Sequence, residues 1–219
     1  MRLIIDEKLR SDHPGLNVLL SSISGVAVKS FDESLESFKG EVFERVKAMY
    51  GLESLKDEPI FRAYRDFFWK IGVDPTKIRP AAEALIRRLL LGKPIPTINT
   101  LVDSYNLASM ETGIALAAFD GGRISGDLLM RYARPGESFQ GIGMKHPVQL
   151  KGVEVVVSDE ERLVAIYPYR DADSSKITEY TKDVILMVCG VPGIDETLLL
   201  KARDTAVSYI ERFCGGTVN

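Results

Sequence analysis

The sequence predicts an α+β fold. Apolar residues recur at helical spacing through most of residues 30–111, strand-like segments follow between residues 114 and 189, and a helical pattern returns near the C-terminus. Helices followed by a run of strands and a last helix do not fit repeating β-α-β units, so we expect a mostly antiparallel sheet core. No internal repeat or linker-like composition divides the chain. We therefore expect residues 1–219 to form a single domain.

The first 55 residues are expected to form strands, turns and one helix. Short apolar runs at residues 3–5, 18–20 and 26–28 are separated by turn residues, which is typical of short strands. Through residues 30–50 the apolar side chains recur every three or four positions. This spacing predicts an amphipathic helix.

Three more helices are predicted before the strands. The first covers residues 57–71 and ends at Gly72, the second begins at Pro80 and ends at Gly92, and a shorter third covers residues 98–111. The two prolines between the first and second helices predict a rigid connector.

Strands are expected at residues 114–119, 124–131, 153–157, 163–169 and 184–189. Residues 120–123, Asp-Gly-Gly-Arg, have the composition of a tight turn, so we expect the first two strands to form a hairpin. A C-terminal helix over residues 195–214 is predicted with Asp195 as its N-cap and two glycines at its end.

Composition excludes several classes of protein. With 45% hydrophobic and 27% charged residues the chain has an ordinary globular balance, and its net charge of −3 gives no overall attraction to nucleic acid or anionic lipid. No apolar run is long enough for a membrane span or a signal peptide, so we expect a cytoplasmic protein without a membrane partner. Cys189 and Cys214 have no partner at metal-ligand spacing and are expected to be unreactive thiols.

General motifs for catalysis or cofactor binding are not found. His13 and His146 each stand beside a proline without a second ligand at helical spacing, so no metal site is expected. Residues 141–143, Gly-Ile-Gly, lack the third glycine of a dinucleotide fingerprint, and neither a nucleophile elbow nor a P-loop occurs. We expect no cofactor.

Two segments carry charge patterns that suggest binding. Residues 70–93 hold six basic and two acidic residues; this segment could contact RNA phosphates, or it could be the solvent face of a helix with a buried leucine side. In residues 167–171, Tyr-Pro-Tyr-Arg-Asp, Arg170 could bind a carboxylate or phosphate, or it could pair with Asp171 beside core tyrosines.

Several motifs in one order carry a family resemblance. They are V-D-x-x-N at residues 102–106, a glycine seven residues later, F-D at 119–120, R-x-A-x-x-G-E at 131–137 and I-T-x-x-T at 177–181. Together they resemble the B3/B4 domain of the bacterial phenylalanyl-tRNA synthetase beta subunit, most strongly over residues 58–190.

The resemblance implies a three-layer fold with a β-sandwich-like core and flanking helices. The resemblance also implies a hydrolytic pocket, which in the full synthetase removes tyrosine from mischarged tRNA. The chain shows no class II aminoacylation motif. The resemblance therefore implies a standalone module that recognises aminoacyl-tRNA or its aminoacyl end. Such a module could hydrolyse mischarged tRNA in trans, or it could bind a free amino acid or a similar small zwitterion without catalysis.

The resemblance carries over only part of the family's site. Asn106 stands at the pocket asparagine, with Tyr105 in place of the usual threonine. Ala117 stands where the family has a histidine and Met187 where it has a glutamate. Neither alanine nor methionine can orient water or recognise a tyrosyl hydroxyl by hydrogen bonds.

Residues 167–172 replace a glycine-rich stretch of the family. We expect Arg170, Asp171 and Asn106 to converge above an apolar floor, with Arg170 binding a phosphate or carboxylate, Asp171 an ammonium, and Asn106 a carbonyl or hydroxyl. The expected catalytic residues are Asn106 and Asp171. The expected substrate-binding residues are Tyr105, Asn106, Phe119, Arg170, Thr178 and Met187, and the expected RNA-binding residues are Lys77, Arg79, Arg87, Arg88 and Lys93.

Overall fold

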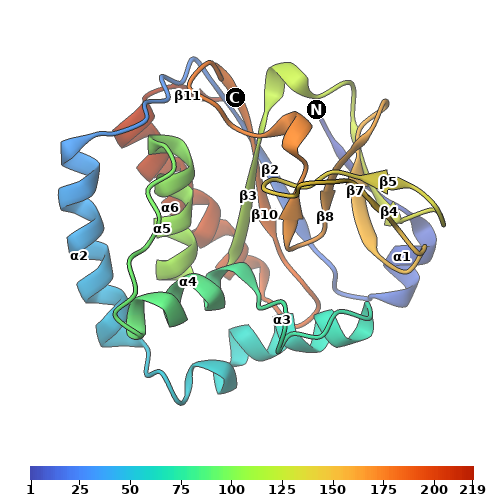
Figure 1. The fold of residues 1–219 in the computed structure, drawn as a ribbon, viewed down its shortest axis with the longest axis horizontal. Coiled ribbons are helices and arrows are strands. Elements are labelled where there is room, and N and C mark those ends of the chain that lie inside the picture. The colour runs from blue at the N-terminus through green and yellow to red at the C-terminus, as the bar shows by residue number, and fades with distance from the viewer.

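The chain is arranged in three layers in a computed structural model that describes all 219 residues (Figure 1). Helices cover one side of a four-stranded sheet, and a five-stranded sheet lies on its other side. This arrangement confirms the α+β class and the sandwich-like core expected from the sequence.

The N-terminal part contains β1 (Leu3–Ile5), α1 (Glu7–Asp12), β2 (Val18–Ser24) and α2 (Glu33–Met49). Helix α1 was not predicted, because six residues are too few to show a helical period; its one local signal is the Asp6 carboxylate, which accepts the N–H groups of Lys8 and Leu9. Residues 26–28 form no strand. Their backbone instead bonds to segments next to other elements: the Val26 N–H donates to the carbonyl of Lys182, which directly precedes β10.

The remaining predicted helices are present as α3 (Pro59–Lys70), α4 (Ala81–Leu90), α5 (Thr100–Thr112) and α6 (Glu196–Cys214), with a short 3-10 turn η1 (Leu55–Asp57) before α3. Helix α5 ends at Gly113, whose φ of 74° places it in the left-handed region. A side chain is strained in that conformation, which explains the glycine of the motif. None of the helices is both long and apolar enough to cross a membrane.

The four-stranded sheet has the order β11 (Thr217–Val218), β2, β10 (Asp183–Cys189), β3 (Ala115–Asp120), with all pairs antiparallel. Strand β10 lies in the middle, and its Met187 stands opposite both Leu20 of β2 and Ala117 of β3. Strand β3 is therefore an edge strand, next to which α5 and α4 pack.

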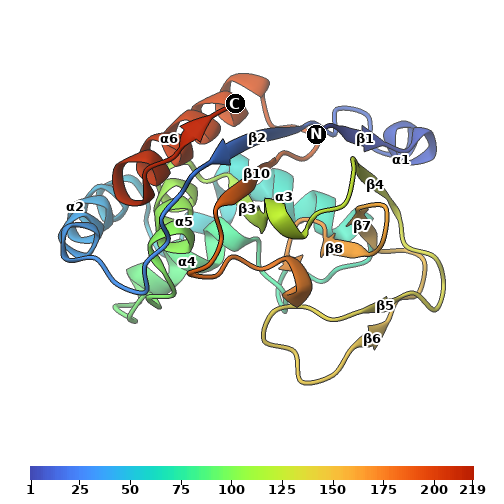
Figure 2. The ribbon, with the colours of Figure 1, turned by 90° about the horizontal axis from the view of Figure 1, so that it is seen from above.

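The five-stranded sheet has the order β1, β4 (Leu128–Tyr132), β7 (Val155–Ser158), β8 (Leu163–Ile166), β9 (Arg170–Asp171). Strands β1 and β4 are parallel, and the other neighbours are antiparallel. A small hairpin of β5 (Ser138–Phe139) and β6 (Val148–Gln149) extends from this side of the molecule (Figure 2). A further 3-10 turn, η3 (Asp173–Ser175), follows β9.

The predicted hairpin between β3 and β4 is wrong. Residues Gly121–Arg123 form the 3-10 turn η2, and the chain passes through it from the four-stranded sheet to the five-stranded sheet. Residues 121–123 do form a turn, but β3 pairs with β10 and not with β4. Turn residues alone do not determine which strand will pair with the strand before them.

The main hydrophobic core fills the space between the two sheets and the space under α6. Helix α3 contacts both sheets. Its fully buried Tyr64 hydroxyl donates to the Cys189 carbonyl at 2.6 Å and accepts the Ala115 N–H at 3.0 Å, and its Phe67 packs edge-on against Tyr167. Tyr64 thus holds the start of β3 next to the end of β10.

Candidate functional site

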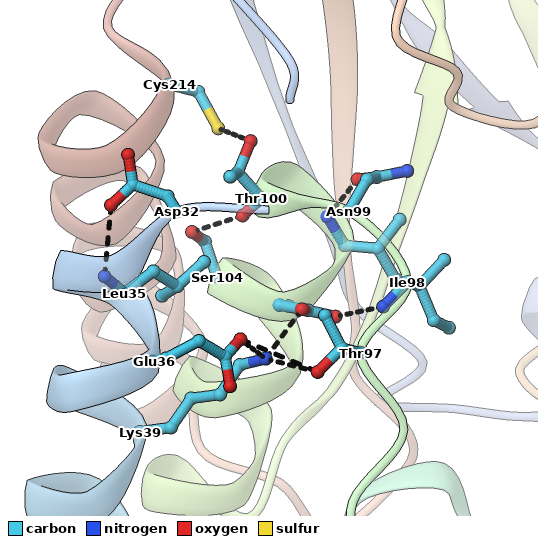
Figure 3. A network of polar contacts seen from close by, with 12 residues as sticks. Asp32, Leu35, Glu36, Lys39, Thr97, Ile98, Asn99, Thr100, Ser104 and Cys214 are labelled. Atoms are coloured by element: carbon cyan, nitrogen blue, oxygen red, sulfur yellow. Dashed lines mark hydrogen bonds and ion pairs between the residues drawn. The ribbon is translucent and has the colours of Figure 1, made fainter. Parts of the chain in front are cut away.

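Asp103, the acidic residue of the V-D-x-x-N motif, is a structural residue at the start of α5. Its side chain is 3% exposed; it accepts from the Lys39 ammonium at 2.8 Å and from the Ile98 N–H at 3.0 Å. Lys39, on α2, is itself 5% exposed and also contacts Glu36 and Thr97 (Figure 3). This buried ion pair fixes the first turn of α5 against α2.

The same turn is also held from its other side. Asn99 caps α5 by accepting the Val102 N–H at 2.9 Å, the Ser104 hydroxyl donates to the Thr100 carbonyl at 2.6 Å, and the Cys214 thiol lies 3.2 Å from the Thr100 hydroxyl (Figure 3). Contacts to α2 and α6 therefore set the position of Tyr105 and Asn106 one to two turns later.

The F-D and I-T-x-x-T motifs bond to each other. The buried Thr181 hydroxyl donates to the Asp120 carboxylate at 2.9 Å and accepts the Thr178 N–H at 3.0 Å. Thr178, an expected substrate-binding residue, is half-buried and lines a surface hollow of about 470 Å³ together with Asn99 and Tyr180. The motif thus closes the loop after η3 onto the end of β3.

The R-x-A-x-x-G-E motif is a second internal clamp. The Arg131 guanidinium donates to both carboxylate oxygens of Glu137, at 2.9 and 2.7 Å, and its hydrogen bonds hold the pKa of Glu137 below its usual range. Such a bidentate pair fixes the turn at residues 131–137.

Asp171 and Arg170 do not converge, contrary to the expectation from the sequence. They are neighbours in β9, and neighbouring side chains of a strand point to opposite faces of the sheet. Arg170 is exposed and donates to the Ile142 carbonyl at 3.2 Å. The two side chains form no ion pair, so the intramolecular alternative does not hold either.

The Asp171 carboxylate is half-buried and makes no hydrogen bond within the chain. Burial raises its pKa to about 7, a shift that the nearby Arg170 charge only partly opposes. A carboxylate with this pKa is partly protonated at neutral pH. It can therefore accept or donate a proton there.

The Tyr105 side chain of α5 lies near Asp171. Burial and then the Asp171 charge raise the pKa of the Tyr105 phenol, and burial and the same charge raise the pKa of the Cys189 thiol at the end of β10. Tyr105 and Asn106 are both half-buried, and neither side chain makes a hydrogen bond within the chain. The structure therefore brings α5, β9 and β10 together around Asp171.

Phe119 and Met187, expected to contact substrate, are fully buried in the main core, with 0% and 1% exposure. Ala117 stands directly opposite Met187 in the β3–β10 ladder. By the alternation of strands, both side chains lie on the same sheet face as Phe119 and Cys189. The two positions at which the resemblance implies histidine and glutamate are thus a pair of apolar residues that stand opposite each other in the sheet.

The expected RNA-binding residues lie together. All five of them, with Ala84 and Leu91, line one surface hollow of about 350 Å³ over the outer face of α4. The other face of α4 is buried through Ala82, Ile86 and Leu89, so the helix has a basic outer side and an apolar buried side. RNA binding by the outer side stays a prediction. No group of three or more histidine, cysteine or acidic residues is placed to hold a metal ion.

Comparison with known proteins identifies the family. The family model described as "B3/4 domain" matches residues 63–215, which is more than half of the chain. The chain belongs to the B3/4 domain family. This confirms the resemblance carried by the five motifs.

Relatives of the chain include beta subunits of phenylalanine–tRNA ligase. The chain is 35% identical over 115 residues to the subunit of Nocardia farcinica, covering 52% of this chain and 13% of that subunit. It is 32% identical over 172 residues to that of Corynebacterium efficiens, covering 68% and 20%. The chain thus spans about a fifth or less of the length of these relatives.

A solved structure shares the fold. An N-terminal fragment of the phenylalanyl-tRNA synthetase beta subunit from Pyrococcus horikoshii superimposes with a TM-score of 0.54 over 99% of this chain and 50% of that one, at 15% identity. The shared fold therefore extends over the first 62 residues, which the family model does not match.

Sequence reasoning missed the buried Lys39–Asp103 pair. Its signal was a lysine four residues after Leu35, on the apolar face of α2 that also carries Val42 and Val46. Because a lysine is rarely buried without a partner, its position predicts a buried carboxylate near that face.

Proposed function

We propose that the chain recognises the aminoacyl end of tRNA and hydrolyses mischarged aminoacyl-tRNA in trans, in the cytoplasm. One observation carries the proposal: the unpaired, half-buried carboxylate of Asp171 lies near Tyr105, on the helix that bears the motif residue Asn106. Membership of the B3/4 family supports a role related to tRNA synthetases.

The chemistry assigned to the site is hydrolysis of an ester. A water oxygen attacks the ester carbonyl, the ionised Asp171 takes a proton from that water, and the departing ribose oxygen receives the proton when the ester bond breaks. The Asn106 amide is assigned to the carbonyl oxygen, on which negative charge develops. Because neither Ala117 nor Met187 can orient or deprotonate water, we assign these roles to Asn106 of α5 and Asp171 of β9.

The hollow over α4 supports an RNA partner. Its five basic side chains include Arg87 and Lys93, which form no ion pair within the chain. Phosphate contacts of this kind weaken as salt rises. A protein with net charge −3 needs such a local patch to hold RNA, and we assign it to the tRNA backbone.

The test is single-turnover deacylation of a panel of correctly and wrongly charged tRNAs, including tyrosine on phenylalanine tRNA. We expect hydrolysis of at least one mischarged species, and a loss of about 100-fold or more for Asp171→Asn, as for removal of a general base. Asp66→Asn, at an exposed carboxylate of α3, is the matched control and should keep the full rate. Rates equal to buffer for every pairing would refute the enzymatic proposal.

A second function is favoured by the same carboxylate. An unpaired Asp171 also suits the ammonium of a free amino acid, and the apolar Ala117–Met187 pair offers nothing to a catalytic water. A screen of free amino acids by thermal shift separates the two functions, because a ligand that binds only the folded chain raises its melting temperature. A shift that Asp171→Asn abolishes, without deacylation of any tRNA, would favour the binding module.

A further inference from the structure

A groove of about 720 Å³ lies between α1, the C-terminal end of α3 and β4, at the end of the molecule opposite α2. This volume is within the range of small-molecule sites. Its walls carry the aromatic rings of Trp69 and Tyr132, four basic side chains and two carboxylates. The basic side chains are those of Lys8, Lys70, Arg131 and Arg134, and the carboxylates are those of Asp6 and Asp12. The proposed deacylation does not use this groove, although Arg131 and Ala133 of the R-x-A-x-x-G-E motif line it.

Trp69 is the only tryptophan of the chain and is 57% exposed. It lies in the last turn of α3, and its ring packs against no other aromatic ring and no cation. Most tryptophan rings are largely buried. An exposed indole beside a groove presents a flat surface on which another aromatic ring can stack.

Arg131 is paired with Glu137, but the other positive charges of the groove form no ion pair, whereas both of its carboxylates accept hydrogen bonds from the chain. Lys70 and Arg134 are exposed and form no ion pair, and the Lys8 ammonium lies 5.4 Å above the Tyr132 ring. Asp12 instead accepts from the Tyr132 hydroxyl at 3.0 Å. The Asp6 carboxylate caps α1.

The walls of the groove are also held in place. The Tyr132 hydroxyl lies between Asp12 and the His13 Nε2, which is 3.1 Å away on the buried side. The last carbonyls of α3 are occupied by the N–H groups of residues 71–73, so the negative end of this helix is capped. A negatively charged ligand in this groove therefore meets cations without an ion-pair partner, whereas the nearby carboxylates and helix carbonyls already accept hydrogen bonds from the chain.

We propose that this groove binds a nucleotide, with its base stacked on Trp69 and its phosphate held by Lys8, Lys70 and Arg134. Stacking on an aromatic side chain next to basic groups is the usual way in which proteins hold a nucleotide of any sequence. The nucleotide is either a free mononucleotide or part of a single-stranded RNA, and the two sources are separated by experiment.

Fluorescence of the single tryptophan reports directly on this groove. We titrate the full chain with AMP, adenosine, inorganic phosphate and a phosphorylated RNA hexamer, each with the same buffer. AMP should quench Trp69 and bind more tightly than adenosine, whereas phosphate alone should leave the fluorescence unchanged. Tighter binding of the hexamer than of AMP identifies an RNA strand as the ligand, and binding of AMP alone identifies a free nucleotide.

Variants give a second readout by calorimetry. Trp69→Ala should weaken AMP binding by about tenfold or more, as loss of a stacking ring does. Lys70→Ala should weaken AMP binding but not adenosine binding, and Lys201→Ala, at an exposed lysine of α6, should change neither. All three should keep the wild-type melting temperature and any deacylation rate, which separates this proposal from the proposed function.

Two results would overturn the proposal. One is an absence of quenching by both AMP and the RNA hexamer up to about 5 mM, a concentration that detects even weak sites. The other is unchanged AMP affinity in a folded Trp69→Ala variant, which would place any nucleotide binding elsewhere on the chain.

Discussion

Replacing Lys39 with methionine should destabilise the protein far more than replacing an exposed lysine of the same helix. Lys39→Met removes the ammonium and leaves Asp103, 3% exposed, with only the Ile98 N–H as a donor. An uncompensated buried charge is the costly case: breaking a buried pair from one side typically costs about 3–5 kcal/mol. For a domain whose total stability is about 5–15 kcal/mol, this is a large fraction.

Asp103→Asn should cost less than Lys39→Met. The asparagine oxygen can still accept the Ile98 N–H, and Lys39 keeps its contact with Glu36, whose side chain is 34% exposed. The loss is then close to that of one charge-assisted hydrogen bond, about 1.5–3 kcal/mol. The two substitutions therefore differ although they break the same 2.8 Å contact.

Urea unfolding at pH 7 measures the loss of unfolding free energy in Lys39→Met, Asp103→Asn and a control variant, provided that the m-value stays constant. Lys47→Met is the matched control, since Lys47 lies on α2 and pairs with Glu44 at 2.8 Å on the surface. It should cost about 0–1 kcal/mol. Equal losses for Lys39→Met and Lys47→Met would refute the argument that the buried pair fixes α5.

The remaining predictions concern pH, a motif hydrogen bond and two glycines. The pKa of Asp171 is raised from about 3.9 in the unfolded chain to about 7, so the folded form keeps a proton that the unfolded form loses between these values, and stability falls as pH rises through that window. The melting temperature of Asp171→Asn should therefore exceed that of the wild type at pH 8 but not at pH 4. The same difference in melting temperature at both pH values would contradict the raised pKa. Thr181→Val should lower the unfolding free energy by about 1–3 kcal/mol, because it leaves the buried Asp120 without its hydroxyl donor, and an unchanged urea midpoint would argue against that bond. Gly190→Ala should cost about 1–3 kcal/mol, since its Cβ would lie 2.3 Å from the Asn17 carbonyl oxygen, whereas Gly40→Ala in α2, with open space around it, should gain about 0.4–1 kcal/mol; the same midpoint for both would exclude overpacking at Gly190.

The elements predicted best were those that carry their own local signal. Helices α3 to α6 could be predicted because apolar spacing and capping residues such as Asp195 and Gly113 act within one element. The β3–β4 hairpin could not, because pairing depends on which distant strand offers a partner, and Asp120 is held by Thr181 from 61 residues away. The residues of a turn do not determine which distant strand will pair with the strand before them.

The candidate site was predicted unevenly for a similar reason. Tyr105 and Asp171 were named from the sequence and lie near each other, because the family resemblance placed both positions at one pocket. Arg170 was grouped with Asp171 because they are adjacent in sequence, although adjacency in a strand separates side chains. The Trp69 groove was missed because its residues come from α1, α3 and β4, none of which has a shared pattern.

The two cysteines are natural reporters of how the protein opens. Cys189 lies in the central strand of the four-stranded sheet and Cys214 in the last turn of α6, and burial raises the pKa of both thiols. A maleimide or similar reagent can modify them only when the surrounding structure separates, since it needs both access and thiolate. Fraying of one helical turn exposes Cys214, while Cys189 requires the whole sheet to come apart. The ratio of their modification rates therefore measures the gap between local and global unfolding without any engineered probe.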